Sequence, residues 1–241
     1  MAEIDYGSRL RAGMLIPSGN SVAEPEIRAM LPRDVSMLVT RLALKGSSRP
    51  ELMQMLEQLE IASRLLADAE VDVIVFHCTA VSTFAPELAG DICRRIRSAS
   101  GIACFTTADA ILAGLAHLKA KRVSLLTPYI DDVHAREIGF LEANGFQVER
   151  SANLGIDTNA EMARLTPAAI LAWASDRISS RADACLVSCT AIKSAPVIAE
   201  LERVSGVPVL TSNQSMVWHL LRSNGVGAGV EAYGRLLSSD R

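Results

Sequence analysis

The chain has 241 residues, of which 49% are hydrophobic and 21% charged, and its formal net charge at neutral pH is −3. No apolar run reaches the roughly 18 residues that a membrane-spanning helix needs. Lysine and arginine are spread among acidic residues, so no basic stripe is available for nucleic acid, and a membrane or nucleic-acid partner is excluded. The opening segment lacks the apolar core of a secretory signal, so we expect a cytoplasmic protein with reduced thiols.

Short β-branched runs alternate with longer amphipathic runs along the whole chain. Strands are predicted over 13–16, 37–44, 71–76, 102–106, 122–126, 146–151, 184–187 and 208–211. Helices are predicted over 23–30, 50–69, 86–97, 108–119, 131–143, 167–179, 195–204 and 215–222. This alternation is typical of an α/β fold with parallel sheets, here about four strands each, covered by helices on both faces.

One segment of the sequence occurs twice. Residues 72–80 read DVIVFHCTA and residues 183–191 read DACLVSCTA, which places Cys78 and Cys189 at matching positions 111 residues apart. The same offset carries Pro17-Ser18 onto Pro128-Tyr129, and an offset of 105 aligns glycine and threonine of 101–106 with those of 206–211. We interpret the chain as one α/β unit written twice, with a tightly packed helical boundary near residues 107–120.

The repeated cysteines are the strongest candidates for chemistry. A single cysteine after a buried strand is usually a small hydrophobic residue, but recurrence in both halves favours a functional pair. Each is expected at a helix N-terminus, where backbone N–H groups lower a thiol pKa. Two thiols on opposite walls of a cleft suit an enzyme that moves a proton, or forms a bond, on either face of a flat carbon.

The loops beside the cysteines carry uncharged hydrogen-bond donors. Ser18 and Asn20 follow the first predicted strand, where two interpretations remain open, an anion site or an ordinary helix cap. Tyr129 ends a strand in the matching loop and could donate its phenol to a carboxylate. Asn159 lies in a polar loop and either binds substrate or caps a helix.

The amides after each cysteine form two similar cradles, made by Thr79 and Ala80 in the first half and by Thr190 and Ala191 in the second. Duplicated anion sites predict a small dicarboxylate substrate, with the reacting carbon held between the thiols. A monocarboxylate would leave one set of donors unpaired, at a cost of roughly 1–3 kcal/mol.

Other chemistries find little support. The sequence contains no Ser-His-Asp set, no G-x-G-x-x-G after a strand and no P-loop. No C-x-x-C pair is present, and a metal site made by His77, Cys78 and Cys189 lacks a further ligand at a recognised spacing, so no metal is expected.

Six motifs together resemble a known family: PSGN at 17–20, HCTAV at 77–81, TPYIDDV at 127–133, IDTNAEMAR at 156–164, SCTAI at 188–192 and AYGRLL at 232–237. They are similar to the maleate cis-trans isomerase and arylmalonate decarboxylase branch of the aspartate/glutamate racemase superfamily. The resemblance implies two pseudosymmetric domains, each with a four-stranded parallel sheet, an active site between them and no cofactor. It also implies that the chain crosses over, so that residues 1–107 and 213–241 form one domain and 108–212 the other.

The resemblance assigns roles to particular residues. Cys78 would be the nucleophile that adds to the substrate double bond, Cys189 the facing acid/base, and Asn20, Tyr129 and Asn159 the groups that hold carboxylates. After addition, rotation about the resulting single bond and expulsion of the thiolate would convert maleate to fumarate. Decarboxylases of this branch have glycine at the position of Cys78, and isomerases usually show S-S-N-T where this chain has S-G-N-S.

Three alternatives stay open at this stage. Two opposed thiols also suit a racemase of an amino diacid or hydantoin, by proton exchange. A substituted malonate could be decarboxylated instead, or the cleft could be a diacid-binding module without catalysis. A homodimer is compatible with the sequence.

Overall fold

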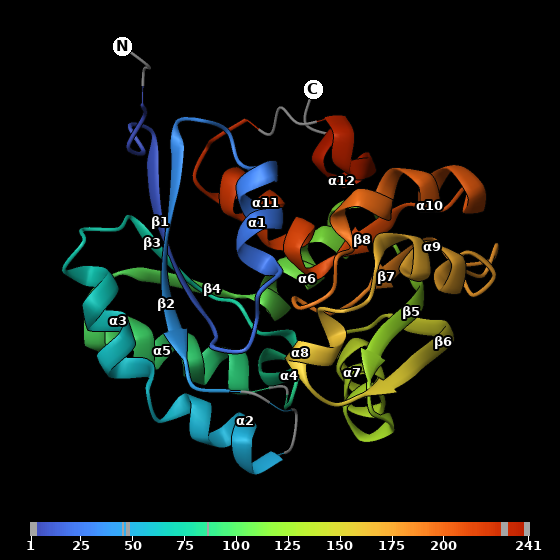
Figure 1. Ribbon diagram of the computed structural model, residues 1–241, viewed down its shortest axis with the longest axis horizontal. Helices are drawn as coiled ribbons and strands as arrows, with labels where there is room; N and C mark the ends of the chain where they lie inside the picture. The colour runs from blue at the N-terminus through green and yellow to red at the C-terminus, as the bar shows by residue number, and fades with distance from the viewer. Residues whose placement is uncertain (1–3, 45, 47–48, 86, 228–230, 239–241) are drawn as a thin grey trace.

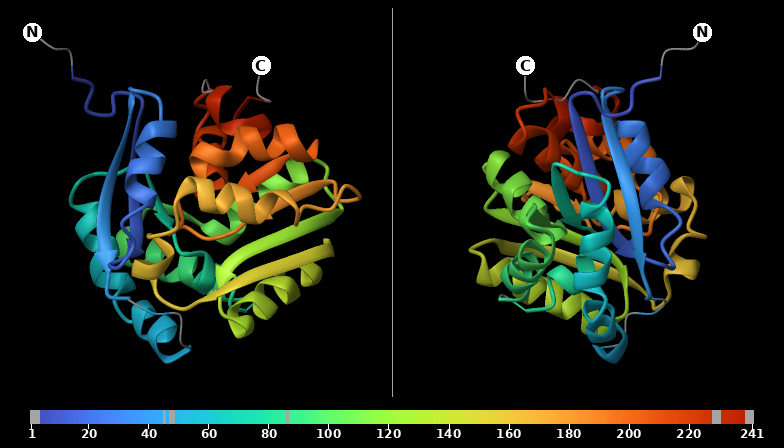
Figure 2. Two further views of the ribbon diagram at one scale, coloured as in Figure 1. Left: turned by 45° about the vertical axis from the view of Figure 1, so that its right-hand side comes forward. Right: turned by 90° about the vertical axis from the view of Figure 1, so that its left-hand side faces the viewer.

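The computed structural model describes residues 4–44, 46, 49–85, 87–227 and 231–238. It contains two four-stranded sheets that stand side by side, the first in blue to green and the second in yellow-green to orange (Figures 1 and 2). Their strand orders are β2-β1-β3-β4 and β6-β5-β7-β8, and every recorded strand pair is parallel. The α/β class with four strands a sheet, predicted from the sequence, is confirmed.

The strands are β1 Leu10–Pro17, β2 Val35–Leu42, β3 Val73–Phe76, β4 Ala103–Thr106, β5 Arg122–Tyr129, β6 Gln147–Ile156, β7 Ala184–Val187 and β8 Val209–Thr211. The α-helices are α1 Ala23–Met30, α2 Arg49–Leu56, α3 Leu59–Ala67, α4 Thr79–Ser82, α5 Leu88–Ser100, α6 Thr107–His117, α7 Asp131–Ala143, α8 Asn159–Met162, α9 Pro167–Ser175, α10 Ile198–Ser205, α11 Ser212–Ser223 and α12 Gly234–Ser238. Two 3₁₀ turns, η1 Ala195–Val197 and η2 Glu231–Tyr233, complete the order. In the part of the chain described here, no helix is long and apolar enough to cross a membrane.

All eight predicted strands are present, but one predicted helix is wrong. The segment 50–69 forms two helices, α2 and α3, with Glu57 and Gln58 between them. In the turn between the two helices, the Gln58 side chain points to the first sheet, where its Oε1 accepts a 2.9 Å hydrogen bond from the Ala43 backbone N–H beyond β2. The short helices α4, α8 and α12 have no counterpart among the predicted elements.

The duplication is visible in matching hydrogen bonds. Asp72 and Asp183 precede equivalent strands, and each accepts a bond from the first strand of its own half, from the backbone N–H of Arg11 at 2.7 Å and of Arg122 at 2.8 Å. Thr106 and Thr211 each form a capping box at the start of the helix that follows. The offsets in the sequence therefore correspond to equivalent places in the fold.

The two halves share their cores rather than having one each. One apolar cluster contains buried residues of both sheets together with α1, α6 and α11, and a second cluster contains the other face of both sheets. Helix α11, from the end of the chain, packs against α6 and α1. This packing fits a chain that returns to its first half; the domain limits themselves stay a prediction.

Candidate active site

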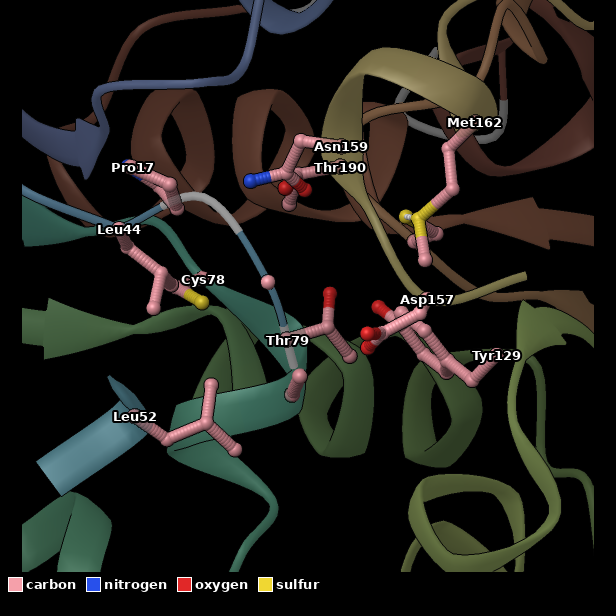
Figure 3. Close-up of a pocket in the computed structure, with 13 residues that line it drawn as sticks. Pro17, Leu44, Leu52, Cys78, Thr79, Tyr129, Asp157, Asn159, Met162 and Thr190 are labelled. Carbon is pink, nitrogen blue, oxygen red and sulfur yellow. Dashed lines mark hydrogen bonds between the residues drawn. The ribbon is translucent and has the colours of Figure 1, made fainter. Parts of the chain in front are cut away.

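The two repeated cysteines line one small cavity between the halves of the molecule. Each follows the carboxyl end of a parallel strand, β3 for Cys78 and β7 for Cys189, which is where α/β folds place their ligand sites. The cavity volume is about 20 Å³, room for roughly one water molecule. The residues that line it are Pro17, Leu44, Gly46, Leu52, Cys78, Thr79, Ala80, Tyr129, Asp157, Asn159, Met162, Cys189 and Thr190 (Figure 3).

Cys78 lies at the start of the four-residue helix α4, as its N-cap. The backbone N–H groups of Ala80 and Val81 point at its sulfur and favour the thiolate, whereas the cradle expected from the sequence was made by Thr79 and Ala80. Burial acts in the opposite direction and is the larger effect, so the pKa of the Cys78 thiol is raised to about 12. In this cavity the thiol is protonated at neutral pH.

Cys189 is held differently. No helix begins at this residue, which is followed by turns, so the expected helix N-terminus is absent from the second half. Its sulfur accepts a 3.2 Å hydrogen bond from the backbone N–H of Ala191 and a bond from the Tyr129 hydroxyl, and it lies 3.7 Å from the Met162 sulfur. Its backbone φ of 145° is a conformation that residues with a side chain rarely adopt.

The expectation that the thiol pKa values are lowered is wrong for both cysteines. Burial outweighs the hydrogen bonds from Tyr129 and Ala191, and it raises the pKa of Cys189 to about 12 as well. The sequence shows where hydrogen-bond donors stand but not how deeply the sulfur is buried, and burial determines the sign here.

Five of the predicted binding residues line the cavity with the thiols: Thr79, Ala80, Tyr129, Asn159 and Thr190. Tyr129 is buried, and burial is also the main reason that the pKa of its phenol is raised, which keeps the hydroxyl a donor. Asn159 is the first residue of α8, and the N-cap of this helix is Thr158. Asn159 therefore does not cap the helix, which favours the other alternative, that its amide binds substrate at the cavity.

The structure does not bring the other three predicted binding residues into the cavity lining. Ser18 is an exposed residue, and its hydroxyl accepts a 3.1 Å hydrogen bond from the backbone N–H of Leu44. Asn20 is buried; its Oδ1 caps the start of α1 and its Nδ2 donates to Thr190 Oγ1 at 3.0 Å. Ala191 contributes its N–H to the sulfur of Cys189 instead.

Several lining residues were missed by sequence reasoning. Asp157 and Met162 belong to the same IDTNAEMAR segment as Asn159, which was the available signal, and Leu44 and Leu52 close the apolar side. Asp157 is the one charged side chain among the described lining residues. Figure 3 shows Tyr129 and Asp157 reaching toward the cavity from one side and Cys78 from the other.

A buried polar network lies behind the two thiol loops. Ser212, the first residue of α11, accepts hydrogen bonds from the Thr79 hydroxyl at 2.9 Å and from the Cys189 backbone N–H at 3.0 Å. The His77 ring is within hydrogen-bond distance of Asn213 at 2.9 Å and of Thr107 at 3.1 Å, so both its nitrogens are engaged away from the cavity. Helix α11 therefore ties the two loops together.

The fold and the site together describe an α/β protein with a pair of thiols at equivalent strand ends, between two parallel sheets. The family model for arylmalonate decarboxylase matches residues 12–237, and the chain belongs to this family. The resemblance expected from the six sequence motifs is thereby confirmed.

Relatives of two activities match the chain over almost its full length. The maleate isomerase of Nocardia farcinica is 30% identical over 241 residues, covering 95% of this chain and 96% of the relative. The arylmalonate decarboxylase of Bordetella bronchiseptica is 31% identical over 229 residues, covering 93% and 95%. A solved structure of the Nocardia farcinica maleate cis-trans isomerase, a cysteine-to-serine mutant with a covalently bound succinylcysteine intermediate, has a TM-score of 0.92, 28% identity and coverage of 96% and 99%.

Proposed function

We propose that the protein is a cofactor-independent cis-trans isomerase of a small enedioate, converting maleate to fumarate through a covalent cysteine adduct. The observation that carries this proposal is that Cys78 and Cys189 line the same cavity, among neutral donors. The covalent succinylcysteine in the Nocardia farcinica isomerase supports the same chemistry. Cys78 also separates this chain from the decarboxylases, in which the resemblance places glycine at this position.

The reaction begins with the sulfur of Cys78 attacking one alkene carbon. The attacking form is the thiolate, so the Cys78 thiol first gives up its proton to solvent; a C–S bond then forms, the π pair moves to the neighbouring carbon, and that carbon takes the thiol proton of Cys189. Cys189, on the facing wall, is suited to deliver and later remove this proton. Rotation about the new single bond and loss of the Cys78 thiolate leave the trans alkene.

Neutral groups would hold the two carboxylates. The Tyr129 hydroxyl, the Asn159 amide and the backbone N–H groups after each cysteine are the donors near the cavity. Asp157 would disfavour a carboxylate placed directly beside it. A four-carbon diacid is larger than a cavity with room for one water, so binding requires some of the lining segments to move apart.

The direct test is maleate turnover with and without Cys78. We expect the purified protein to remove maleate absorbance and release fumarate, and we expect Cys78→Ala and Cys78→Ser to lose this activity. Cys93→Ser, which removes a thiol outside the cavity lining, is the matched control and should remain active. An active Cys78→Ala variant would refute the nucleophile assignment.

A racemase is the second candidate, because two thiols in one cavity also suit proton exchange on both faces of a carbon. This activity would appear as deuterium uptake from D₂O into an amino diacid or hydantoin, with maleate left untouched. Decarboxylation of a substituted malonate ranks third, supported by the decarboxylase relative. A cytoplasmic location and a homodimer remain predictions from the sequence.

A further inference from the structure

Two buried glutamates lie behind the thiols, and the duplication relates them. Glu26 on α1 is 9% exposed and Glu137 on α7 is 1% exposed. They are 111 positions apart, which is the offset between Cys78 and Cys189. A buried carboxyl group lowers the stability of the folded protein unless hydrogen bonds or an ion pair compensate for its lost hydration. Its presence at the equivalent position of both halves therefore indicates a role.

Glu137 holds the residue before Cys189. Its Oε1 accepts a short hydrogen bond from the Ser188 hydroxyl, while its Oε2 is buried with no hydrogen-bond partner. Tyr129 and Cys189 are the titratable groups that face it from β5 and from the loop after β7, and His134 lies one turn earlier on its own helix. Because the Glu137 carboxyl group is buried and one of its oxygens has no partner, its neutral form is favoured.

Glu26 holds the residue after Cys189. Its Oε2 accepts a 2.7 Å hydrogen bond from the Asn213 amide, which also donates to the Thr190 carbonyl at 3.3 Å. Its Oε1 accepts a 3.0 Å bond from the backbone N–H of Ala195, farther along the same loop. The oxygen of the same Asn213 amide lies within hydrogen-bond distance of the ring of His77, the residue before Cys78.

Cys189 needs such support because of its backbone. A non-glycine residue at φ 145° is strained and persists only where its surroundings fix it. Ser188 and Thr190, its two chain neighbours, are tied to Glu137 and, through Asn213, to Glu26. The two acids thus brace the strained residue from both sides.

We propose that Glu26 and Glu137 are a duplicated pair of positioning residues that hold Cys189 in its strained conformation and control the charge near its sulfur. The proposal rests on the role given to Cys189 and does not require maleate as the substrate. Burial raises the pKa of each carboxyl to about 7, and the charge of either one, once ionised, raises the pKa of the Cys189 thiol. Below about pH 7 both carboxyls are neutral and do not add to the increase of the Cys189 pKa that burial causes.

Turnover tests the bracing. We expect Glu137→Leu to lower kcat at least about tenfold with KM changed less than about twofold, and Glu137→Gln, which keeps the acceptor for Ser188, to restore most of it. Glu202 on α10 is another buried glutamate, 7% exposed, and serves as the control; it accepts hydrogen bonds from the backbone N–H groups of Val209 and Arg235. Glu202→Leu should lower stability without this loss of kcat. If Glu137→Leu does not fold, Ser188→Ala removes the same bond, and wild-type kcat in the folded variants would overturn the proposal.

Thiol reactivity tests the charge without any substrate. In a Cys78→Ser background, the rate of iodoacetamide alkylation at Cys189 is measured from pH 5.5 to 9.5 with and without Glu137→Gln. Above pH 7 the glutamine variant should react faster, by about threefold or more, because it lacks the ionised carboxylate; near pH 5.5 the two rates should agree. Superimposable profiles would overturn the electrostatic part even if the protein fails to isomerise maleate, and Glu202→Gln should leave the profile unchanged.

Discussion

At the residue scale, Tyr129 at the end of β5 contacts the Cys189 thiol in the loop that follows β7. Its hydroxyl donates to the Cys189 sulfur and favours the thiolate, against the burial that disfavours it. We expect Tyr129→Phe to raise the Cys189 pKa further and to lower kcat by about tenfold or more, the cost of one lost donor to a developing charge. Steady-state kinetics check this, with the exposed Tyr6→Phe, 78% exposed in the native protein, as the control.

Wild-type kcat in Tyr129→Phe would contradict this role. The sequence could predict Tyr129, Cys78 and Cys189 because Tyr129 ends a strand and each cysteine closely follows one, all in repeated segments. Glu26 and Glu137 carried the same offset and are each followed by isoleucine, which was a weak signal that our sequence reasoning did not use. Asp157 was missed because the sequence does not show how close its loop comes to the thiols.

At the element scale, α6 and α11 begin with equivalent capping boxes. Thr106 and Thr211 each accept a 3.2 Å hydrogen bond from the backbone N–H three residues later, of Asp109 and of Gln214. We expect Thr106→Val and Thr211→Val, which remove the hydroxyl and keep the shape, each to lower the free energy of unfolding by about 1 kcal/mol. Urea unfolding measures this.

Ser98→Ala, on an exposed position of α5, is the control for the two caps and should change stability little. Unequal losses, with one variant at wild-type stability, would contradict the equivalence of the two caps.

Strand positions were predictable because buried parallel strands are short β-branched runs. The break between α2 and α3 was not, because the apolar pattern of 50–69 continues across it; the turn there is accompanied by a tertiary contact of Gln58 with the chain after β2.

At the scale of the whole molecule, the buried carboxyls link stability to pH. Glu137 has a pKa raised to about 7 in the folded protein from 4.5, so the folded state holds this proton more tightly than the unfolded chain. The free energy of unfolding therefore falls as pH rises from about 4.5 to about 7, by about 3 kcal/mol for this group. Glu26 acts in the same direction.

Glu137→Gln isolates this effect. Relative to the wild type, the variant should be more stable at pH 8.5 than at pH 5 by up to about 3 kcal/mol, because it has no proton to lose. Unfolding in urea at the two pH values measures the difference, and Glu26 cancels because it is present in both proteins. A difference independent of pH would show that Glu137 titrates normally.

The shared core also belongs to this scale. The repeated sequence predicted two sheets, but composition and periodicity could not show that buried residues of both sheets form common clusters around α6 and α11. That arrangement places the two thiols across one cavity, and the proposed chemistry depends on it.

The central claim is that the Cys78 sulfur adds to an alkene while Cys189 faces it. The most direct measurement is intact-protein and peptide mass spectrometry of Cys189→Ser after incubation with maleate. We predict a gain of one maleate mass on the peptide that contains Cys78, and no gain in the Cys78→Ser, Cys189→Ser double variant. An unmodified Cys78 peptide, in a variant whose wild-type parent isomerises maleate, would contradict the claim.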